Sequence, residues 1–238
     1  MFVGVEQFLD KDEVRVLVED YGRLYSEMLG IDVSSGRSTE IFKWFLASML
    51  FGAPIRDNTA IKTYESFRKH NVLTPERILT TGWEGLVVIL DEGGYARYDE
   101  KTTDKLLSVM KNLKEKYGGD LVCLYEKSLD ASDLEASLKA LGKGIGATTV
   151  SIFLRELRDV WTKSDSRPTA LVIEAAESLG IVKKGVPPED ALEQLKQFWL
   201  KNKIKGKSFI YFETALSKLG IEMRRKKGQA SRRLRVRA

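Results

Sequence analysis

The sequence predicts an all-α fold. Apolar residues recur every three or four positions along most of the chain, as one face of a helix requires. No stretch shows the sustained alternation of apolar and polar residues that a half-buried strand needs. Glycine, proline and capping residues divide these patterns into segments of ordinary helix length. The 238 residues, 43% of them hydrophobic, suffice for one large globular domain or two small ones.

The first two expected helices differ in character. An amphipathic helix spans about residues 11–29 and ends at Gly30. Ser38 or Thr39 caps the second helix, which is apolar nearly all round. A helix of that kind is expected at the centre of a bundle, because each of its faces needs burial. Pro54 then breaks the pattern, since proline cannot continue the helical hydrogen-bond ladder.

Shorter patterns fill the middle of the chain. Asp57 or Asn58 begins a helix that runs to Phe67. Thr74 and Pro75 have the residue types of an N-cap and a first helical position. Further helices are expected at about 78–80, 83–90, 99–117 and 121–126, with glycine pairs at 93–94 and 118–119 between the last three.

Residues 132–161 predict two helices joined by a glycine-rich turn. Ser132 and Glu135 have capping-box spacing at the start of the first helix, which stops at Gly142. The apolar face of the second helix consists of Val150, Phe153, Leu154 and Leu157. The turn and the residues that lead into the second helix are Gly142, Lys143, Gly144, Ile145, Gly146, Ala147, Thr148 and Thr149.

Helix stability does not explain three glycines among five residues of this turn, because glycine costs about 1 kcal/mol relative to alanine inside a helix. Glycine permits positive φ and lets another molecule approach the main chain closely. Backbone amides that lead into a helix N-terminus can then converge on an anion such as a phosphate diester. The alternative is an ordinary connector between two helices.

The C-terminal part of the chain begins with a polar loop at 162–168 and continues with helices at about 169–179, 187–200 and 209–219. No acidic residue follows Glu222. The basic residues beyond it are Arg224, Arg225, Lys226, Lys227, Arg232, Arg233, Arg235 and Arg237. Such a tail is either an electrostatic contact for nucleic acid or a disordered solubilising segment. Both interpretations stay open at this point.

Composition excludes several classes of protein. No apolar run approaches the roughly 20 residues of a membrane span, and the N-terminus lacks the plan of a signal peptide. A soluble cytoplasmic protein without a membrane partner is therefore expected. One cysteine, Cys123, and one histidine, His70, leave little for a disulfide, a zinc site or a histidine-based triad. We expect no cofactor. The charged fraction of 31% is typical of a thermophile.

The pattern LGKGIGATTV at 141–150, with a helix on each side, resembles the helix-hairpin-helix of the endonuclease III-like DNA glycosylase superfamily. Residues 42–57 resemble the early core helix of that family and the turn after it, and residues 91–106 resemble its glycine-led loop into the next helix. Residues 169–180 occupy the place of the helix after the catalytic aspartate. The resemblance covers roughly 39–180.

The resemblance implies a domain organisation. One helical subdomain would combine residues 1–38 with 162–222, and residues 39–161 would form the second. A DNA-binding cleft would lie between the two, and the basic tail would occupy 223–238. Cys123 alone cannot ligate the four-cysteine iron–sulfur cluster that some members of the family carry.

The resemblance also implies a function. The hairpin amides of the family grip a phosphate of duplex DNA, often with a monovalent cation on hairpin carbonyls and without metal-ligating side chains. A damaged or mismatched base is then flipped out of the helix and its N-glycosidic bond is hydrolysed. This chain would accordingly be a base-excision-repair glycosylase that acts as a monomer on double-stranded DNA.

The catalytic positions depart from the family pattern. Thr148 occupies the position of the lysine that forms a Schiff base in bifunctional members, so the resemblance implies a monofunctional enzyme. Thr169 occupies the approximate place of the catalytic aspartate. Asp165 is the first candidate for that carboxylate, and Asp159 is the second. The alternatives are a non-catalytic DNA-binding protein and an abasic-site lyase that uses another lysine, such as Lys163.

Further DNA contacts are expected from the surrounding loops. Tyr95, after the glycine pair 93–94, is a candidate wedge between base pairs or, alternatively, an ordinary core tyrosine. Arg56 and Arg97 would hold phosphates at the same surface. Asp159 has its own alternative as a helix-surface residue paired with a nearby arginine.

Overall fold

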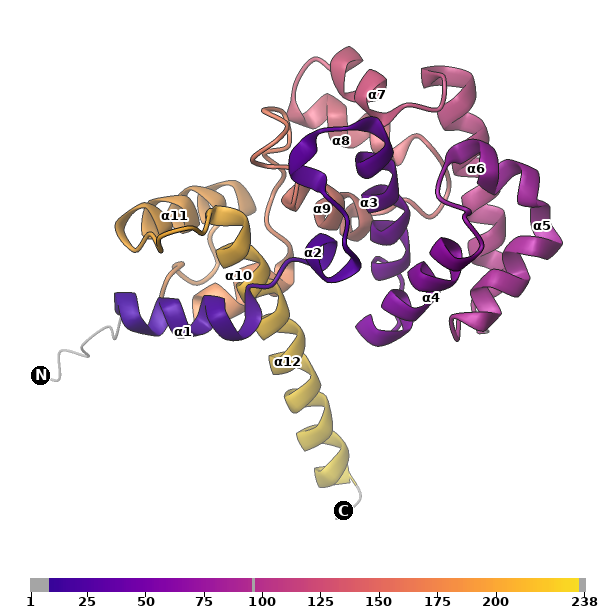
Figure 1. Cartoon of the computed structure of the whole chain (residues 1–238). Helices are drawn as coiled ribbons and strands as arrows, with labels where there is room; N and C mark the ends of the chain where they lie inside the picture. Colours follow the sequence, from indigo (N-terminus) through magenta and orange to yellow (C-terminus); the bar gives the residue numbers. More distant parts are fainter. Residues whose placement is uncertain (1–8, 96, 236–238) are drawn as a thin grey trace, which may run out of the picture. The chain divides into compact units, whose positions relative to one another are not determined.

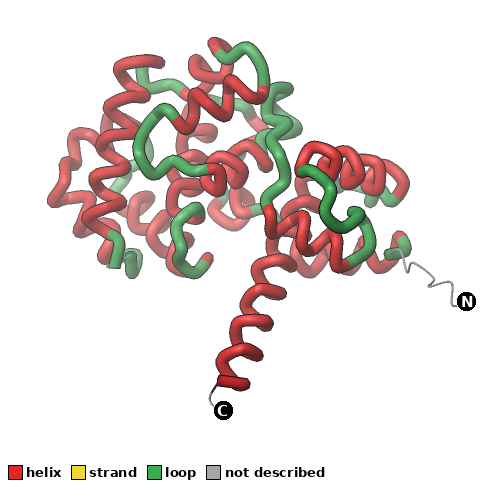
Figure 2. Tube along the Cα trace, turned by 180° about the vertical axis from the view of Figure 1, so that it is seen from behind, coloured by secondary structure: helices red, strands yellow, loops and turns green. Residues whose placement is uncertain are grey.

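The computed structural model describes residues 9–95 and 97–235, and within these ranges the secondary structure is entirely helical (Figure 1, Figure 2). The prediction of an all-α fold is confirmed. The elements in chain order are α1 (Lys11–Tyr21), α2 (Tyr25–Leu29), the 3-10 helix η1 (Val33–Ser35), α3 (Ser38–Phe51), α4 (Asp57–Lys69), α5 (Pro75–Glu92), α6 (Asp99–Tyr117), α7 (Leu121–Lys127), α8 (Ala131–Lys139), α9 (Ala147–Arg155), α10 (Ala170–Ser178), α11 (Pro188–Lys201) and α12 (Phe209–Arg235). None of the described helices combines the length and the apolarity needed to cross a membrane.

The described chain divides into two compact units. The first combines the residues before Tyr25 with those after Ser166, and the second comprises Tyr25–Ser166. The core of the first unit is built by α1, α10, α11 and α12, and that of the second by α2 to α9. The division is discontinuous, like the organisation that the resemblance implies, but its boundaries lie after residues 24 and 166 instead of 38 and 161.

Contacts of the segment after Leu24 explain the shifted boundary. The expected helix over 11–29 is wrong in one respect, because it stops at Tyr21 and a separate helix, α2, begins at Tyr25. The backbone N–H groups of Tyr25 and Ser26 donate to the Glu156 carboxylate at 2.9 and 3.1 Å. This carboxylate lies 131 residues away from Tyr25 in the sequence. A tertiary contact therefore starts α2 and places it in the second unit.

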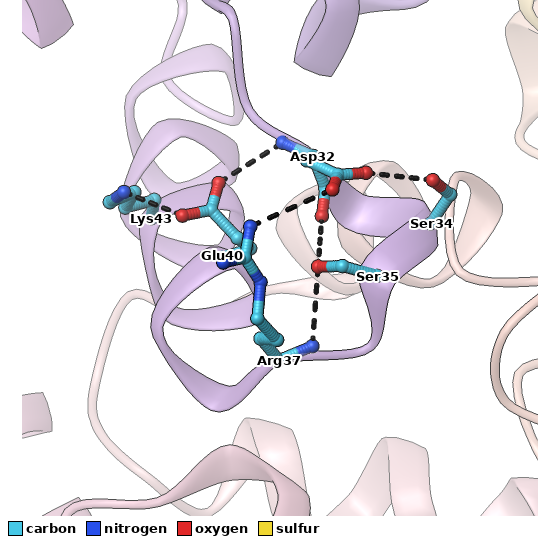
Figure 3. A network of polar contacts seen from close by, with 6 residues as sticks. All are labelled: Asp32, Ser34, Ser35, Arg37, Glu40 and Lys43. Carbon is cyan, nitrogen blue, oxygen red and sulfur yellow. Dashed lines mark hydrogen bonds and ion pairs between the residues drawn. The ribbon is translucent and has the colours of Figure 1, made fainter.

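A polar network fixes the loop between α2 and α3 to the start of α3 (Figure 3). Glu40 accepts hydrogen bonds from the Asp32 backbone N–H at 3.0 Å and from Lys43 at 2.6 Å. Asp32 in turn accepts a hydrogen bond from Ser34 at 2.7 Å and lies 3.6 Å from the Arg37 guanidinium. The segment that was expected to end the first subdomain at residue 38 is thus tied to α3 of the second unit.

The central position expected for the helix after Ser38 is confirmed. Trp44, Phe45 and Leu46 of α3 are fully buried, and α3 contacts α4, α7 and α9 (Figure 1). The Trp44 indole N–H donates to the Phe153 carbonyl of α9 at 3.0 Å. Helix α3 is thus surrounded by other helices, and its contacts with α9 fix the position of α9 and of the turn before it.

The last helix is longer than expected. The prediction of a helix over 209–219 is too short, because α12 continues to Arg235 and includes most of the basic tail. Its partly buried apolar contacts with the core of the first unit extend as far as Met223. The residues that follow are rich in arginine and lysine, which are good helix formers, and contain no proline. Arg237 lies outside the described residues.

Candidate nucleic-acid interface

The two helices expected within 132–161 are α8 and α9, and the glycine-rich turn of residues 140–146 connects them. Both ends of the pair differ from expectation. The N-cap of α8 is Asp130, whose carboxylate accepts the Asp133 backbone N–H at 2.9 Å, so the capping box at Ser132 is wrong. Helix α9 ends at Arg155, and the chain continues to Trp161 through turns, although Leu157 remains buried.

Apolar side chains anchor this turn to the second unit. Leu141 and Ile145 are buried, and the Ile145 backbone N–H donates to the Gly142 carbonyl at 3.1 Å. Gly142 lies tightly against α6, since a Cβ at this position would be 2.7 Å from a methyl group of Val109. Gly144 has a φ of +96°, which side-chain-bearing residues rarely adopt. The glycines at 142 and 144 are therefore required by packing and by backbone conformation.

Gly146 has a different role. It is the N-cap of α9 in an extended conformation with φ −95° and ψ 177°, which any residue can adopt. A Cβ on Gly146 would meet no atom within 4 Å. Neither packing nor backbone conformation requires glycine at this position. The distinguishing feature of Gly146 is the open space beside it.

That open space lies before the first turn of α9. Lys143, Gly144, Gly146, Ala147 and Thr148 are all exposed, and no side chain caps the helix. The first amides of an α-helix have no intrahelical acceptor and carry partial positive charge. The N-terminus of α9 is consequently accessible to an anion from solution, with the charge of Lys143 beside it.

Elsewhere in the second unit a carboxylate already occupies such a position. Glu156 is buried and accepts the first two amides of α2, as described above. Burial raises the pKa of Glu156, despite the opposing charge of Arg155 and these hydrogen bonds. The second unit thus contains two kinds of helix N-terminus: that of α2 is closed by the Glu156 carboxyl group, and that of α9 is open.

The two candidate carboxylates lie in the chain after α9. The Asp165 carboxylate accepts a hydrogen bond from Arg158 at 2.9 Å, and its side chain is 48% exposed. Arg158 also donates to the carbonyls of Ser164 and Ser166 and thereby holds the loop in shape. Asp159 is exposed on the turn that follows α9. It is not a helix-surface residue, and Arg158 is paired with Asp165.

Tyr95 does not have the position of a wedge. It is 1% exposed and belongs to the core of the second unit, which agrees with the core interpretation and contradicts the wedge prediction. Two residues earlier, Gly93 packs closely against α4, because a Cβ at this position would collide with the backbone of Thr63. Arg97 is exposed next to the Tyr98 ring, and Arg56 is the exposed N-cap residue of α4.

The lysine named for a lyase reaction is engaged in backbone contacts. Lys163 donates to the carbonyls of Tyr125 and Ser128, both at 2.6 Å, and its ammonium lies 4.4 Å from the centre of the Tyr125 ring. These contacts favour a structural role, because they hold the amine against the loop between α7 and α8.

Sequence reasoning did not identify Lys105 of α6. The side chain of Lys105 runs alongside the turn, such that a Cβ at Gly144 would lie 3.0 Å from its Cδ. Its ammonium donates to the Met49 carbonyl at 3.2 Å, and burial lowers its pKa to about 8. The signal in the sequence was a lysine next to Leu106 and one helical turn before Val109, both of which are on the buried face of α6.

No family model, curated protein or solved structure matches this chain. The resemblance of residues 39–180 to the DNA glycosylase superfamily therefore stays a prediction based on residue patterns. Among the described residues, no group of three or more His, Cys, Asp or Glu side chains is placed to hold a metal ion.

Proposed function

We propose that this protein binds the phosphate backbone of duplex DNA through the turn between α8 and α9 and acts there as a base-excision glycosylase. The observation that carries the proposal is the exposed N-terminus of α9, capped by a glycine that neither packing nor conformation requires. A missing side chain at Gly146 leaves room for a polynucleotide strand, and the adjacent Lys143 adds positive charge. The turn would bind DNA without regard to sequence, since phosphate contacts carry no sequence information.

The basic segment of α12 supports the same partner. Residues 224–229 are exposed, and no acidic residue follows Glu222 in the sequence. Two of its cations already have partners, because Arg224 pairs with Glu174 and Lys226 pairs with Glu222. The positive charge that exceeds these pairs would contribute a salt-dependent term to DNA affinity.

Asp165 is the proposed catalytic group. Its carboxylate would stabilise the positive charge that develops on the sugar as the base departs, or activate water for attack on that carbon. In the structure this carboxylate accepts a hydrogen bond from the Arg158 guanidinium. A monovalent cation on carbonyls of the turn, a monomeric state and the absence of a cofactor remain parts of the proposal.

The second candidate is a DNA-binding protein without glycosylase chemistry. The ion pair between Asp165 and Arg158 favours it, because a carboxylate used to shape a loop is restrained from reaching a sugar. Base release from a panel of lesion-containing duplexes separates the two candidates. Asp165→Asn with full base-release activity would remove this residue from the mechanism. An abasic-site lyase is tested by borohydride trapping, which needs a reactive amine near the sugar.

The decisive test of DNA binding is Gly146→Asp. Aspartate is a good N-cap, so the new carboxylate would satisfy the amides of α9 and repel phosphate while the fold is retained. We expect the affinity for a short duplex to fall at least about tenfold at moderate salt, as loss of a charge-assisted contact worth about 1.5–3 kcal/mol requires. The unfolding midpoint should stay level or rise. Binding is measured by fluorescence anisotropy and unfolding by circular dichroism.

The matched control is Thr74→Asp, which replaces one capping residue with another at the N-terminus of α5 and adds the same charge. It should lower the affinity much less than Gly146→Asp does. Equal losses for the two variants would mean that net charge, and not the turn, determines binding. A wild-type protein that does not bind duplex DNA would overturn the proposed function as a whole.

A further inference from the structure

Helix α6 forms the platform on which the glycine turn rests. Three of its residues, each about one turn apart, contact the connection between α8 and α9. Asn112 donates to the Leu141 carbonyl at 2.8 Å, Val109 lies against Gly142, and Lys105 lies against Gly144. The first two contacts are structural, since one satisfies a backbone carbonyl and the other fills space. Lys105 differs because it brings a charge to the same edge.

The ammonium of Lys105 has donors to spare. A lysine ammonium carries three N–H donors, and within the part of the chain that the structure describes the Met49 carbonyl is its one acceptor. Met49 lies in the last turn of α3, where carbonyls lack intrahelical partners and attract a cation. Burial lowers the pKa of Lys105 to about 8, so the amine is still mainly charged at pH 7. A desolvated cation with two unfilled donors gains more from an anion than a fully hydrated one does.

Gly144 makes this arrangement compatible with an exposed turn. A side chain at Gly144 would meet the Lys105 stem, whereas glycine lets the stem lie along the turn while the turn's outer surface remains open. The lysine thus approaches the candidate interface from beneath, and Lys143 approaches it from the exposed side. The terminal bonds of Lys105 can adopt several staggered rotamers, so its ammonium can exchange the Met49 carbonyl for another acceptor within its reach.

We propose that Lys105 is a phosphate-binding residue of this interface, and that its ammonium and the first amides of α9 bind the DNA backbone together. The proposal rests on the proposed function, because it assigns a further ligand to the same site. In the free protein the ammonium is held by Met49, and in the complex one or more of its donors turns to a phosphate oxygen. The alternative is a strut that only links α6 to α3.

The experiment measures how DNA affinity depends on salt in the full-length protein. Each phosphate contact contributes about 0.9 to the slope of log K against log salt concentration for duplex DNA. We expect Lys105→Met to lower this slope by about 0.9, which is the loss of one contact. Lys105→Arg should keep the slope, since arginine also binds phosphate. The control is Lys101→Met, which removes an exposed lysine one turn earlier on α6 and should change the slope less.

Each outcome decides the question. An unchanged slope in Lys105→Met, together with lost binding in Gly146→Asp, would leave the proposed function standing and reduce Lys105 to a strut. If Lys105→Met does not fold, Lys105→Gln gives the same comparison, because it removes the charge and keeps a polar side chain with N–H donors. Absence of DNA binding in the wild-type protein would overturn both proposals.

Discussion

Two glycine turns of the second unit were expected at a DNA surface, and in the structure one of them is open and the other is closely packed. The turn before α9 is anchored by buried Ile145 and presents Gly146 to open space. The turn after α5 packs Gly93 against the backbone of Thr63 and is followed by buried Tyr95. Glycine thus leaves the main chain open to solvent in one turn, and it lets a neighbouring helix approach the main chain in the other. The identity of the approaching group is what the sequence leaves open.

The comparison shows which neighbouring residues distinguish the two cases. In the turn before α9, exposed Lys143 and Thr148 flank the glycines, so the outer surface is polar, while Leu141 and Ile145 are buried in the core. After Gly93 the chain continues to an aromatic residue whose burial stabilises the fold. In this protein the glycines beside polar residues belong to the open turn, and the glycine two residues before a buried tyrosine belongs to the closely packed one.

The largest expected effect of substitution is at the closed turn. In Gly93→Ala the new Cβ would collide with the Cα of Thr63, which belongs to the backbone of α4 and cannot move alone. We expect a loss of about 3 kcal/mol or more in the free energy of unfolding, the upper range for overpacking a core. Urea denaturation followed by circular dichroism measures it. The folded fraction should bind duplex DNA as the wild type does, and a selective loss of binding would show that this turn also faces DNA.

The open turn should respond more weakly, and two of its three glycines, Gly144 and Gly146, should respond differently. Gly144→Ala places a side chain at a φ of +96° and 3.0 Å from Lys105, so we expect a loss of about 1–2 kcal/mol. Gly146→Ala should cost less than about 1 kcal/mol, because its conformation and surroundings accept a Cβ. Thermal unfolding compares the pair. Equal losses would contradict the distinction between a required glycine and a permissive one.

Much of the fold was predictable because its causes are local. The starts of α4 and α5, the length of α6 and the glycine turn before α9 follow from capping residues, glycine, proline and helical periodicity. The break between α1 and α2 was not predictable in this way, since the group that starts α2 is the distant Glu156. Local patterns cannot report such a contact.

The candidate site likewise has features that local sequence predicts and features that depend on tertiary contacts. Exposure of Lys143, Gly146 and Thr148 agrees with the interpretation of the turn as a surface. Lys105 was missed because its importance depends on the packing of α6 against the turn, 39 residues later at Gly144. Tyr95 could not be assigned from sequence, because a wedge and a core tyrosine have the same residue type and the same glycine neighbours.

The smallest effect tests the closed helix N-terminus at α2, the counterpart of the open one at α9. Burial raises the pKa of Glu156 above its usual 4.5, so the native state binds a proton here more readily than the unfolded state does. The contribution of Glu156 to the free energy of unfolding is therefore fully present below pH 4.5, the usual carboxyl pKa. It is lost as the pH rises through the raised pKa of the folded state. Glu156→Gln removes this titration. The variant also loses one hydrogen-bond acceptor for α2, which lowers the free energy of unfolding by an amount that does not vary with pH.

We consequently expect the stability of the wild type, relative to Glu156→Gln, to decline as the pH rises above the usual carboxylate pKa and through the raised pKa of Glu156. Urea unfolding at a series of pH values measures the difference. Glu115→Gln, at an exposed position of α6, is the matched control and should run parallel to the wild type. Parallel curves for Glu156→Gln as well would mean that this carboxylate titrates normally. Burial of the Glu156 carboxyl group at the N-terminus of α2 would then have no energetic cost. The N-termini of α2 and α9 would differ only in their geometry.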